Sequence, residues 1–198
     1  MTGYRIITAR PEHLARLGQV EREAATVFPP GSIPDEIRAD EVSLEVLAEA
    51  QEAGRLWVAV PSCGCNEAAC NGGASGGPDS PAGNAPGPVG FALMRICGDI
   101  ALLAQMDVLP AHARKGLGRG LIRQAAARAW AQGFPALYLT TFAHIPWNAP
   151  FYARLGFQAL ERNGLPPVLQ EILESERKMG LRNRLAMRLD LSGDNFEI

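Results

Sequence analysis

Short apolar runs and amphipathic stretches alternate along the chain and predict its secondary structure. Contiguous or alternating apolar residues predict strands at 4–9, 56–60, 89–96, 101–108, 136–142 and 185–191. Apolar positions that recur every three or four residues predict helices at 11–27, at 43–53, from 117 to Gly133, and at 166–179. The resulting order is one strand, two helices and three strands, followed by helices and strands in alternation.

The helix that ends before Gly133 carries the clearest apolar stripe. Its members follow one another at four-residue spacing, with two further residues widening the stripe: Leu117, Leu121, Ala125 and Ala129, then Ile122 and Trp130. Segment 28–36 contains three prolines, so it is not expected to form a regular helix.

The turn between strand 101–108 and this helix is rich in glycine and basic residues. Gly116, Gly118 and Gly120 let the backbone approach a ligand closely, and the first N–H groups of the helix lack partners within it. The helix dipole and the side chains of Arg114, Lys115 and Arg119 add positive charge. The turn therefore predicts a phosphate site, although it contains neither Gly-Lys-Ser/Thr nor Gly-x-Gly-x-x-Gly.

Composition is typical of a globular enzyme or binding domain. The 198 residues, 47% hydrophobic and 20% charged, suit one domain spanning 1–198. A formal charge of −2 gives no electrostatic reason to expect nucleic acid. There is no apolar run of membrane-spanning length and no hydrophobic signal core at the start, so we expect a cytoplasmic protein.

Residues 61–88 form a tract of low hydrophobicity between two predicted strands. Its glycines and prolines cannot bury enough surface to offset ordering, so we expect a disordered hairpin insertion within the domain. Three of the four cysteines, Cys63, Cys65 and Cys70, lie in it, without the Cys-x2-Cys pairs of structural zinc sites. Reduced thiols are the favoured interpretation and no metal is expected, with a partner-binding role for the tract as a weaker hypothesis.

A second motif follows about thirty residues after the glycine-rich turn. Residues 148–157 read NAPFYARLGF, after the predicted strand ALYLTTF. The glycine-rich turn followed by Asn-x-x-Phe-Tyr-x-x-x-Gly-Phe resembles the GNAT superfamily of acetyl-CoA-dependent N-acetyltransferases. The resemblance covers 101–157 and implies an α/β (α+β) fold. Its central sheet would be mixed, mostly antiparallel and of six to seven strands, with helices flanking it.

The resemblance also implies a site and a cofactor. Acetyl-CoA would be the co-substrate, with its pantetheine arm in a gap between strands 101–108 and 136–142. The backbone of Met106 and Val108 would hold that arm, and the Val108 N–H would face the thioester oxygen. Asn148 would contact the coenzyme, and Tyr152 would protonate the departing thiolate. The family's Gln/Arg position falls here on Ala113, so the diphosphate would depend on the turn: Ala113, Arg114, Lys115, Gly116, Leu117, Gly118, Arg119 and Gly120.

The general base and the amine acceptor stay open. Gln105 occupies the neighbourhood in which many relatives carry a glutamate; the candidate bases are Asp107, His144, Glu21 and water. Glu21 and Glu23 are also candidates to bind a cationic amine. Segment 28–36 and residues 145–147 would line the acceptor pocket, with Phe28, Phe142 and Trp147 as its aromatic candidates.

Two functions remain possible from the sequence. The first is acetyl transfer from acetyl-CoA to a primary amine, either on a small molecule or on a peptide, by direct attack in a ternary complex. The second is a non-catalytic acyl-CoA-binding sensor. Gln105 and Ala113 support it, because each stands where the family pattern has a different residue. Neither a nucleic acid nor a membrane partner is expected, and the protein would be a monomer or a homodimer.

Overall fold

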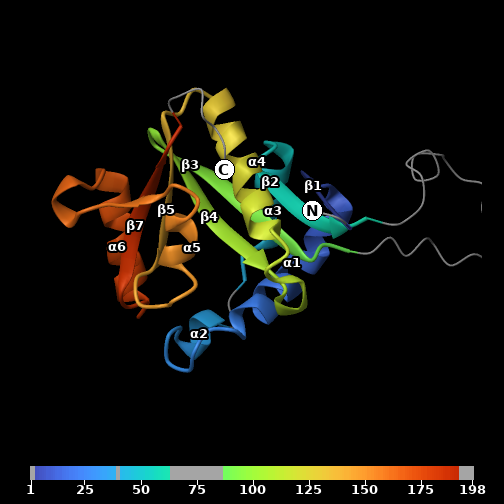
Figure 1. Cartoon of the computed structure of the whole chain (residues 1–198), viewed down its shortest axis with the longest axis horizontal. Coiled ribbons are helices and arrows are strands. Elements are labelled where there is room, and N and C mark those ends of the chain that lie inside the picture. Colours follow the sequence, from blue (N-terminus) through green and yellow to red (C-terminus); the bar gives the residue numbers. More distant parts are fainter. Residues whose placement is uncertain (1–2, 39–40, 63–86, 192–198) are drawn as a thin grey trace, which may run out of the picture.

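The computed structural model describes residues 3–38, 41–62 and 87–191 (Figure 1). The strands are β1 (Tyr4–Thr8), β2 (Leu56–Pro61), β3 (Gly90–Cys97), β4 (Ile100–Val108), β5 (Ala136–Phe142), β6 (Gln158–Ala159) and β7 (Arg184–Asp190). The α-helices are α1 (Pro11–Ala25), α2 (Asp35–Arg38), α3 (Leu44–Glu52), α4 (Leu117–Ala131), α5 (Ala149–Ala153) and α6 (Pro167–Lys178). The strands and longer helices predicted from the sequence are confirmed, with bounds that differ by one or two residues.

The short helix α2 departs from the prediction for segment 28–36. Three prolines keep the chain irregular up to Pro34, and a single helical turn then forms over Asp35–Arg38. The Arg38 N–H donates to the Pro34 carbonyl at 2.9 Å, which closes that turn.

The strands form one sheet in the order β1-β2-β3-β4-β5-β7-β6. All neighbours are antiparallel except β4 and β5, which are parallel. These two strands pair only at Ala101–Leu137 and Leu102–Tyr138. Beyond those pairs they separate and leave an open edge on each strand in the centre of the sheet. The predicted mixed, mostly antiparallel sheet of six to seven strands is confirmed.

A bulge in β4 determines which side chains reach each face of the sheet. The register with β3 shifts between Leu93, opposite Gln105, and Met94, opposite Leu103. After the bulge, Met106 lies on the face covered by α4, near Gly118, whereas Gln105 contacts α1. Figure 1 shows α4 in front of the sheet.

The core is built mainly by α4 against the sheet. Its stripe is confirmed for Leu117, Leu121, Ile122, Ala125 and Ala129, all 1% exposed or less. The prediction for Trp130 was wrong: this residue is 53% exposed, because it lies about 80° further around the helix than Ile122, beyond the buried stripe. A second cluster joins α6 to β4 and β7 through Ile100, Leu102, Leu169 and Ala186.

Strands β2 and β3 flank the predicted insertion and pair antiparallel, with Ala59 opposite Gly90. The two strands therefore depend on each other, as expected. Residues 63–86, with Cys63, Cys65 and Cys70, lie outside the described residues. Among the helices of the described residues, none is both long enough and apolar enough to cross a membrane.

Candidate active site

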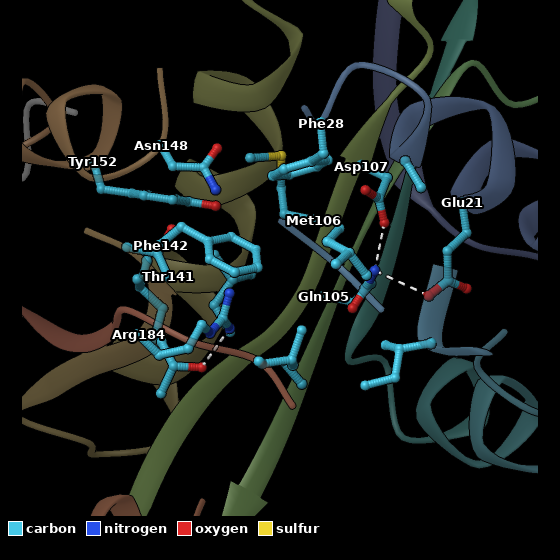
Figure 2. A pocket seen from close by; sticks show the side chains of 18 of the residues that line it. Glu21, Phe28, Gln105, Met106, Asp107, Thr141, Phe142, Asn148, Tyr152 and Arg184 are labelled. Atoms are coloured by element: carbon cyan, nitrogen blue, oxygen red, sulfur yellow. Dashed lines mark hydrogen bonds between the residues drawn. The ribbon is translucent and has the colours of Figure 1, made fainter. Parts of the chain in front are cut away.

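A cavity of about 230 Å³ opens where β4 and β5 separate (Figure 2). Residues from α1, β4, β5 and β7 line it, together with segment 28–38 and the start of α5. Gln105, Met106 and Asp107 form one wall, and Thr140, Thr141 and Phe142 form the facing one. Because the widening gap produces the cavity, whatever occupies it also meets unpaired backbone of both strands.

The predicted phosphate turn leads into the N-terminus of α4. Gly116 is the N-cap, with a φ of 80° that favours glycine, and Arg114 also has a positive φ of 58°. The Gly120 N–H donates to the Gly116 carbonyl at 3.0 Å, so the N–H groups of Leu117, Gly118 and Arg119 precede the first bond of the helix. Residues 113–116 are exposed. This is the geometry expected of an anion site built from main-chain donors.

The basic side chains of the turn differ in what they contact. Lys115 Nζ donates to the Tyr4 hydroxyl at 3.0 Å and to the Ala111 carbonyl at 3.2 Å, and it lies over the Tyr4 ring. His112 Nδ1 lies 2.8 Å from the same hydroxyl. Lys115 is therefore bound to β1, whereas the side chains of Arg114 and Arg119 are exposed.

Gly118 lies at the closest approach of three elements. A Cβ atom there would come 3.2 Å from the Phe151 ring of α5 and 3.5 Å from Met106 Sδ of β4. The glycine thus lets the start of α4 pack against both elements, and this contact joins the two sequence motifs in space.

Backbone alternation directs Met106 and Val108 to the open edge of β4. The Leu109 N–H donates to the Val89 carbonyl at 2.9 Å, on the β3 side. Alternate residues of an antiparallel pair point their backbone groups in opposite directions, so those of Met106 and Val108 point toward β5. Since β5 is not paired with β4 at this level, these groups are available to an extended ligand.

Two carboxylates and an amide form an acidic cluster on the α1 side of the cavity. Gln105 Nε2 donates to Asp107 Oδ2 at 2.6 Å and to Glu21 Oε1 at 3.0 Å. The other Glu21 oxygen accepts from the Val42 N–H at 3.0 Å. Gln105 and Asp107 are two residues apart on β4 and therefore share a face. Gln105 cannot take a proton itself, but it holds both acids in place.

Asp107 has the electrostatics of a general base. Burial raises the pKa of Asp107 from its ordinary value near 3.8 to about 7. The hydrogen bond from Gln105 opposes this pKa rise, and the negative charge of Glu21 adds to it. A carboxyl with a pKa near neutrality can both accept and release a proton at physiological pH.

Tyr152 and Asn148 face the acidic cluster across the cavity (Figure 2). Burial raises the pKa of Tyr152 above its ordinary value, and the nearby Asp107 raises it further. The phenol therefore keeps its proton at neutral pH. Its ring is held by edge contacts with Phe151 and Phe157, with centroids 5.2 and 5.7 Å away.

Other sequence candidates lie outside the cavity lining. His144 is exposed and packs edge-on against Phe142, and Glu23 is exposed and accepts from Gln19. Trp147 is 46% exposed and does not line the cavity, whereas Phe28 and Phe142 do. Of the three residues predicted as bases, Asp107 and Glu21 reach the cavity and His144 does not.

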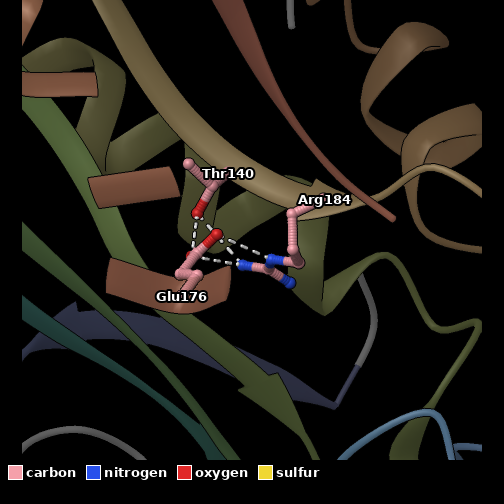
Figure 3. Close-up of polar contacts among 3 residues, drawn as sticks. All are labelled: Thr140, Glu176 and Arg184. Atoms are coloured by element: carbon pink, nitrogen blue, oxygen red, sulfur yellow. Dashed lines mark hydrogen bonds and ion pairs between the residues drawn. The ribbon is translucent and has the colours of Figure 1, made fainter. Parts of the chain in front are cut away.

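The structure adds Arg184, which sequence reasoning missed. It projects from β7 into the cavity, and Glu176 and Thr140 bind it (Figure 3). Arg184 Nε and Nη2 donate to the two Glu176 oxygens at 3.0 and 2.8 Å. Arg184 directly precedes the strand predicted at 185–191, and only the fold brings it beside β5 and α6.

A metal centre has no candidate in the described part of the chain. Across residues 3–38, 41–62 and 87–191, no three His, Cys, Asp or Glu side chains come close enough together to hold a metal ion.

Comparison with known proteins shows which family a part of the chain resembles. The model of the acetyltransferase (GNAT) family matches residues 77–157, which include β3, β4, the glycine-rich turn, α4, β5 and α5. In this segment the chain is similar to the GNAT family. The matched segment contains both motifs that first suggested the resemblance.

Solved structures with the GNAT fold extend the similarity over the whole chain. The PaiA N-acetyltransferase of Thermoplasma acidophilum, solved with coenzyme A, is 16% identical with a TM-score of 0.62 over 96% of this chain and 99% of its own. The ribosomal-protein-S18-alanine N-acetyltransferase of Escherichia coli is 20% identical, with a TM-score of 0.55 and 97% of both chains covered. N-acetylglutamate synthase of Neisseria gonorrhoeae, solved with coenzyme A and N-acetyl-glutamate, is 15% identical with a TM-score of 0.65. That alignment covers 98% of this chain but 36% of the synthase. At these identities the likeness establishes the fold.

Proposed function

We propose that this protein transfers an acetyl group from acetyl-CoA to a primary amine by direct attack in a ternary complex. One observation carries the proposal. A carboxyl with a pKa of about 7 and a phenol that keeps its proton face the same cavity, at the unpaired edges of β4 and β5. Acetyl transfer to an amine needs one proton acceptor and one proton donor on either side of a carbonyl carbon.

The coenzyme would bind along the open edge of β4. Its diphosphate would accept hydrogen bonds from main-chain N–H groups at residues 115–120, where the N-terminus of α4 favours negative charge. Its pantetheine arm would pair with the backbone of Met106 and Val108, and Asn148 would contact it at the cavity. Ala113, Arg114 and Arg119 lie on the exposed side of the turn, close to where the nucleotide part would pass.

The reaction would then use the cavity groups in sequence. Asp107 takes a proton from the acceptor ammonium, and the neutral nitrogen forms a bond to the thioester carbon. The Val108 N–H stabilises the oxyanion of the tetrahedral intermediate. As the carbon–sulfur bond breaks, Tyr152 gives its proton to the thiolate, so that CoA leaves as a thiol. The nitrogen of the new amide loses its second proton to the Tyr152 oxygen, and Asp107 releases the first proton to solvent. Holding both substrates in one cavity supplies much of the rate.

The test is release of free thiol from acetyl-CoA in the presence of a panel of primary amines, with the acetylated product identified by mass spectrometry. We expect amine-dependent thiol release that exceeds hydrolysis without an amine. Thermal shift with acetyl-CoA gives the second measurement, because a ligand of the folded state raises the melting temperature. Stabilisation by acetyl-CoA without thiol release for any amine would instead support the acyl-CoA-binding sensor.

A further inference from the structure

The cavity is electrically asymmetric. Asp107 and Glu21 form its acidic side, on β4 and α1, whereas Arg184 lies on the opposite side, on β7. Strand β5 separates β4 from β7 in the sheet, so the two charged sides belong to different parts of the fold. Figure 2 shows Arg184 beside Phe142, across the cavity from Asp107 and Glu21.

Arg184 is held rigidly but keeps donors for a ligand. Glu176 and Thr140 engage its Nε and Nη2 atoms (Figure 3). Its Nη1 atom makes no hydrogen bond to any residue in the described ranges, and a guanidinium carries two N–H groups there. The guanidinium carbon also lies 4.5 Å from the centre of the Phe142 ring, and this cation–π contact helps to hold the guanidinium group in place.

The supporting carboxylate explains this rigidity. Glu176 is 8% exposed, and both of its oxygens bind Arg184, while Oε1 also accepts from Thr140 Oγ1 at 2.6 Å. An arginine preorganised in this way loses little side-chain entropy when a second carboxylate binds its free edge. Glu176 and Thr140 are therefore positioning residues for Arg184.

A second guanidinium, that of Arg38 in α2, lines the same cavity. Arg38 donates through Nη1 to the Ala25 carbonyl at 2.7 Å and through Nη2 to the Pro29 carbonyl at 3.4 Å. The segment before α2 touches the segment between α6 and β7, because a Cβ atom at Gly180 would lie 3.0 Å from Pro34 Cγ. Aromatic carbon lies between the charged sides, where the Phe28 and Phe142 ring centres are 5.6 Å apart.

We infer that the acceptor is a small amino acid, whose amine faces Asp107 and whose carboxylate binds Arg184 Nη1. This inference rests on the proposed acetyl transfer and names the acceptor class for it. A cavity of about 230 Å³ is small for a binding pocket, which favours a compact acceptor. Polyamines and other purely cationic amines would leave the free edge of Arg184 unpaired and facing a positive charge.

The first test needs only the wild-type protein. Each standard L-amino acid is compared with its own α-carboxamide, with thiol release as the measurement of kcat/KM. We expect kcat/KM for the best amino acid to exceed kcat/KM for its carboxamide by about 10–100-fold. The carboxamide offers Arg184 a neutral acceptor in place of a charged carboxylate, and that hydrogen bond is weaker. The carboxamide's amine is less basic and more often neutral, so the comparison is biased against the inference.

The second test changes Arg184 and uses a matched control on the same strand. Arg184→Gln should raise the KM of the preferred amino acid about 10–100-fold. The KM values of its carboxamide and of acetyl-CoA should change by less than about twofold. Arg188→Gln removes the same charge from β7 at a residue that pairs with Asp190 and does not line the cavity, so it should leave the preference unchanged. Glu176→Gln should weaken the preference partly, through KM and not through kcat.

The outcomes separate this inference from the function on which it rests. A wild-type preference for carboxamides or for amines without a carboxylate overturns the amino-acid acceptor and leaves acetyl transfer standing. An unchanged preference in a folded Arg184→Gln variant also overturns the role of Arg184. Absence of thiol release with every amine overturns acetyl transfer and this inference with it. If Arg184→Gln does not fold, the wild-type comparison decides alone.

Discussion

The proposed site has a coenzyme half and an acceptor half that are built in different ways. The coenzyme half would consist of main-chain donors at one turn and one strand edge, all within residues 106–120. The proposed acceptor half consists of side chains from α1, β4, β5 and β7, which the fold brings together from positions as far apart as Glu21 and Arg184. The coenzyme would therefore be bound by backbone N–H groups, whereas the acceptor would be selected by charged side chains that the shared fold holds in place.

Asp107→Asn tests the acceptor half, and we expect it to have the largest effect on turnover. The amide keeps an oxygen to accept the Gln105 hydrogen bond but cannot take a proton from the amine. Turnover should fall by about 10²–10⁴-fold with little change in acetyl-CoA affinity, as measured by thiol release and calorimetry. Asp99→Asn, in the exposed turn between β3 and β4, is the matched control and should leave turnover unchanged.

The pH dependence of the wild type and of Asp107→Asn tests whether the loss of turnover comes from the missing base. In the wild type, kcat/KM should fall as pH decreases through about 7, because Asp107 becomes protonated.

A carboxyl whose pKa is raised by folding stabilises the protein when protonated, and that stability is lost as pH rises through the folded pKa. Asp107→Asn should therefore have a higher Tm than the wild type at pH 8, with the difference disappearing near pH 4. Equal pH profiles of activity for the two proteins would remove Asp107 as the base.

Tyr152→Phe should have the next largest effect. Loss of the phenolic proton leaves the thiolate to depart unassisted, so kcat should fall by about 10²-fold. The ring contacts with Phe151 and Phe157 remain, and acetyl-CoA affinity should change by less than about twofold. Tyr138→Phe on β5, outside the cavity lining, is the control. Unchanged turnover in Tyr152→Phe would exclude Tyr152 from proton transfer.

The coenzyme half is tested by comparing the two ends of α4. Gly116 and Gly133 have φ values of 80° and 84°, so valine at either position strains the backbone by about 1–3 kcal/mol. Only Gly116→Val also displaces the N–H groups at the start of the helix. It should weaken CoA binding by at least about tenfold in calorimetry, whereas Gly133→Val should lower Tm without changing Kd. Equal Kd values for both variants would contradict a diphosphate site at this turn.

The sequence predicted the two local motifs and several residues of the cavity wall, namely Glu21, Phe28, Asp107 and Phe142, but not the basic side of the cavity. A glycine-rich turn and Asn148 with Tyr152 are local patterns, and local patterns survive in a single sequence. Arg184 and its partner Glu176 could not be predicted, because an arginine on a half-buried strand and a glutamate on an amphipathic helix have no local signature. The bulge in β4 was likewise invisible, although it decides that Gln105 and Asp107 face α1.

The central claim is that main-chain donors at residues 115–120 bind the diphosphate of CoA. Titration calorimetry with CoA and with pantetheine, which lacks the diphosphate, measures it most directly. We expect CoA to bind at least about 100-fold more tightly than pantetheine in the wild type, and Gly116→Val to remove most of that difference. Equal affinity of the wild type for CoA and pantetheine would contradict the claim.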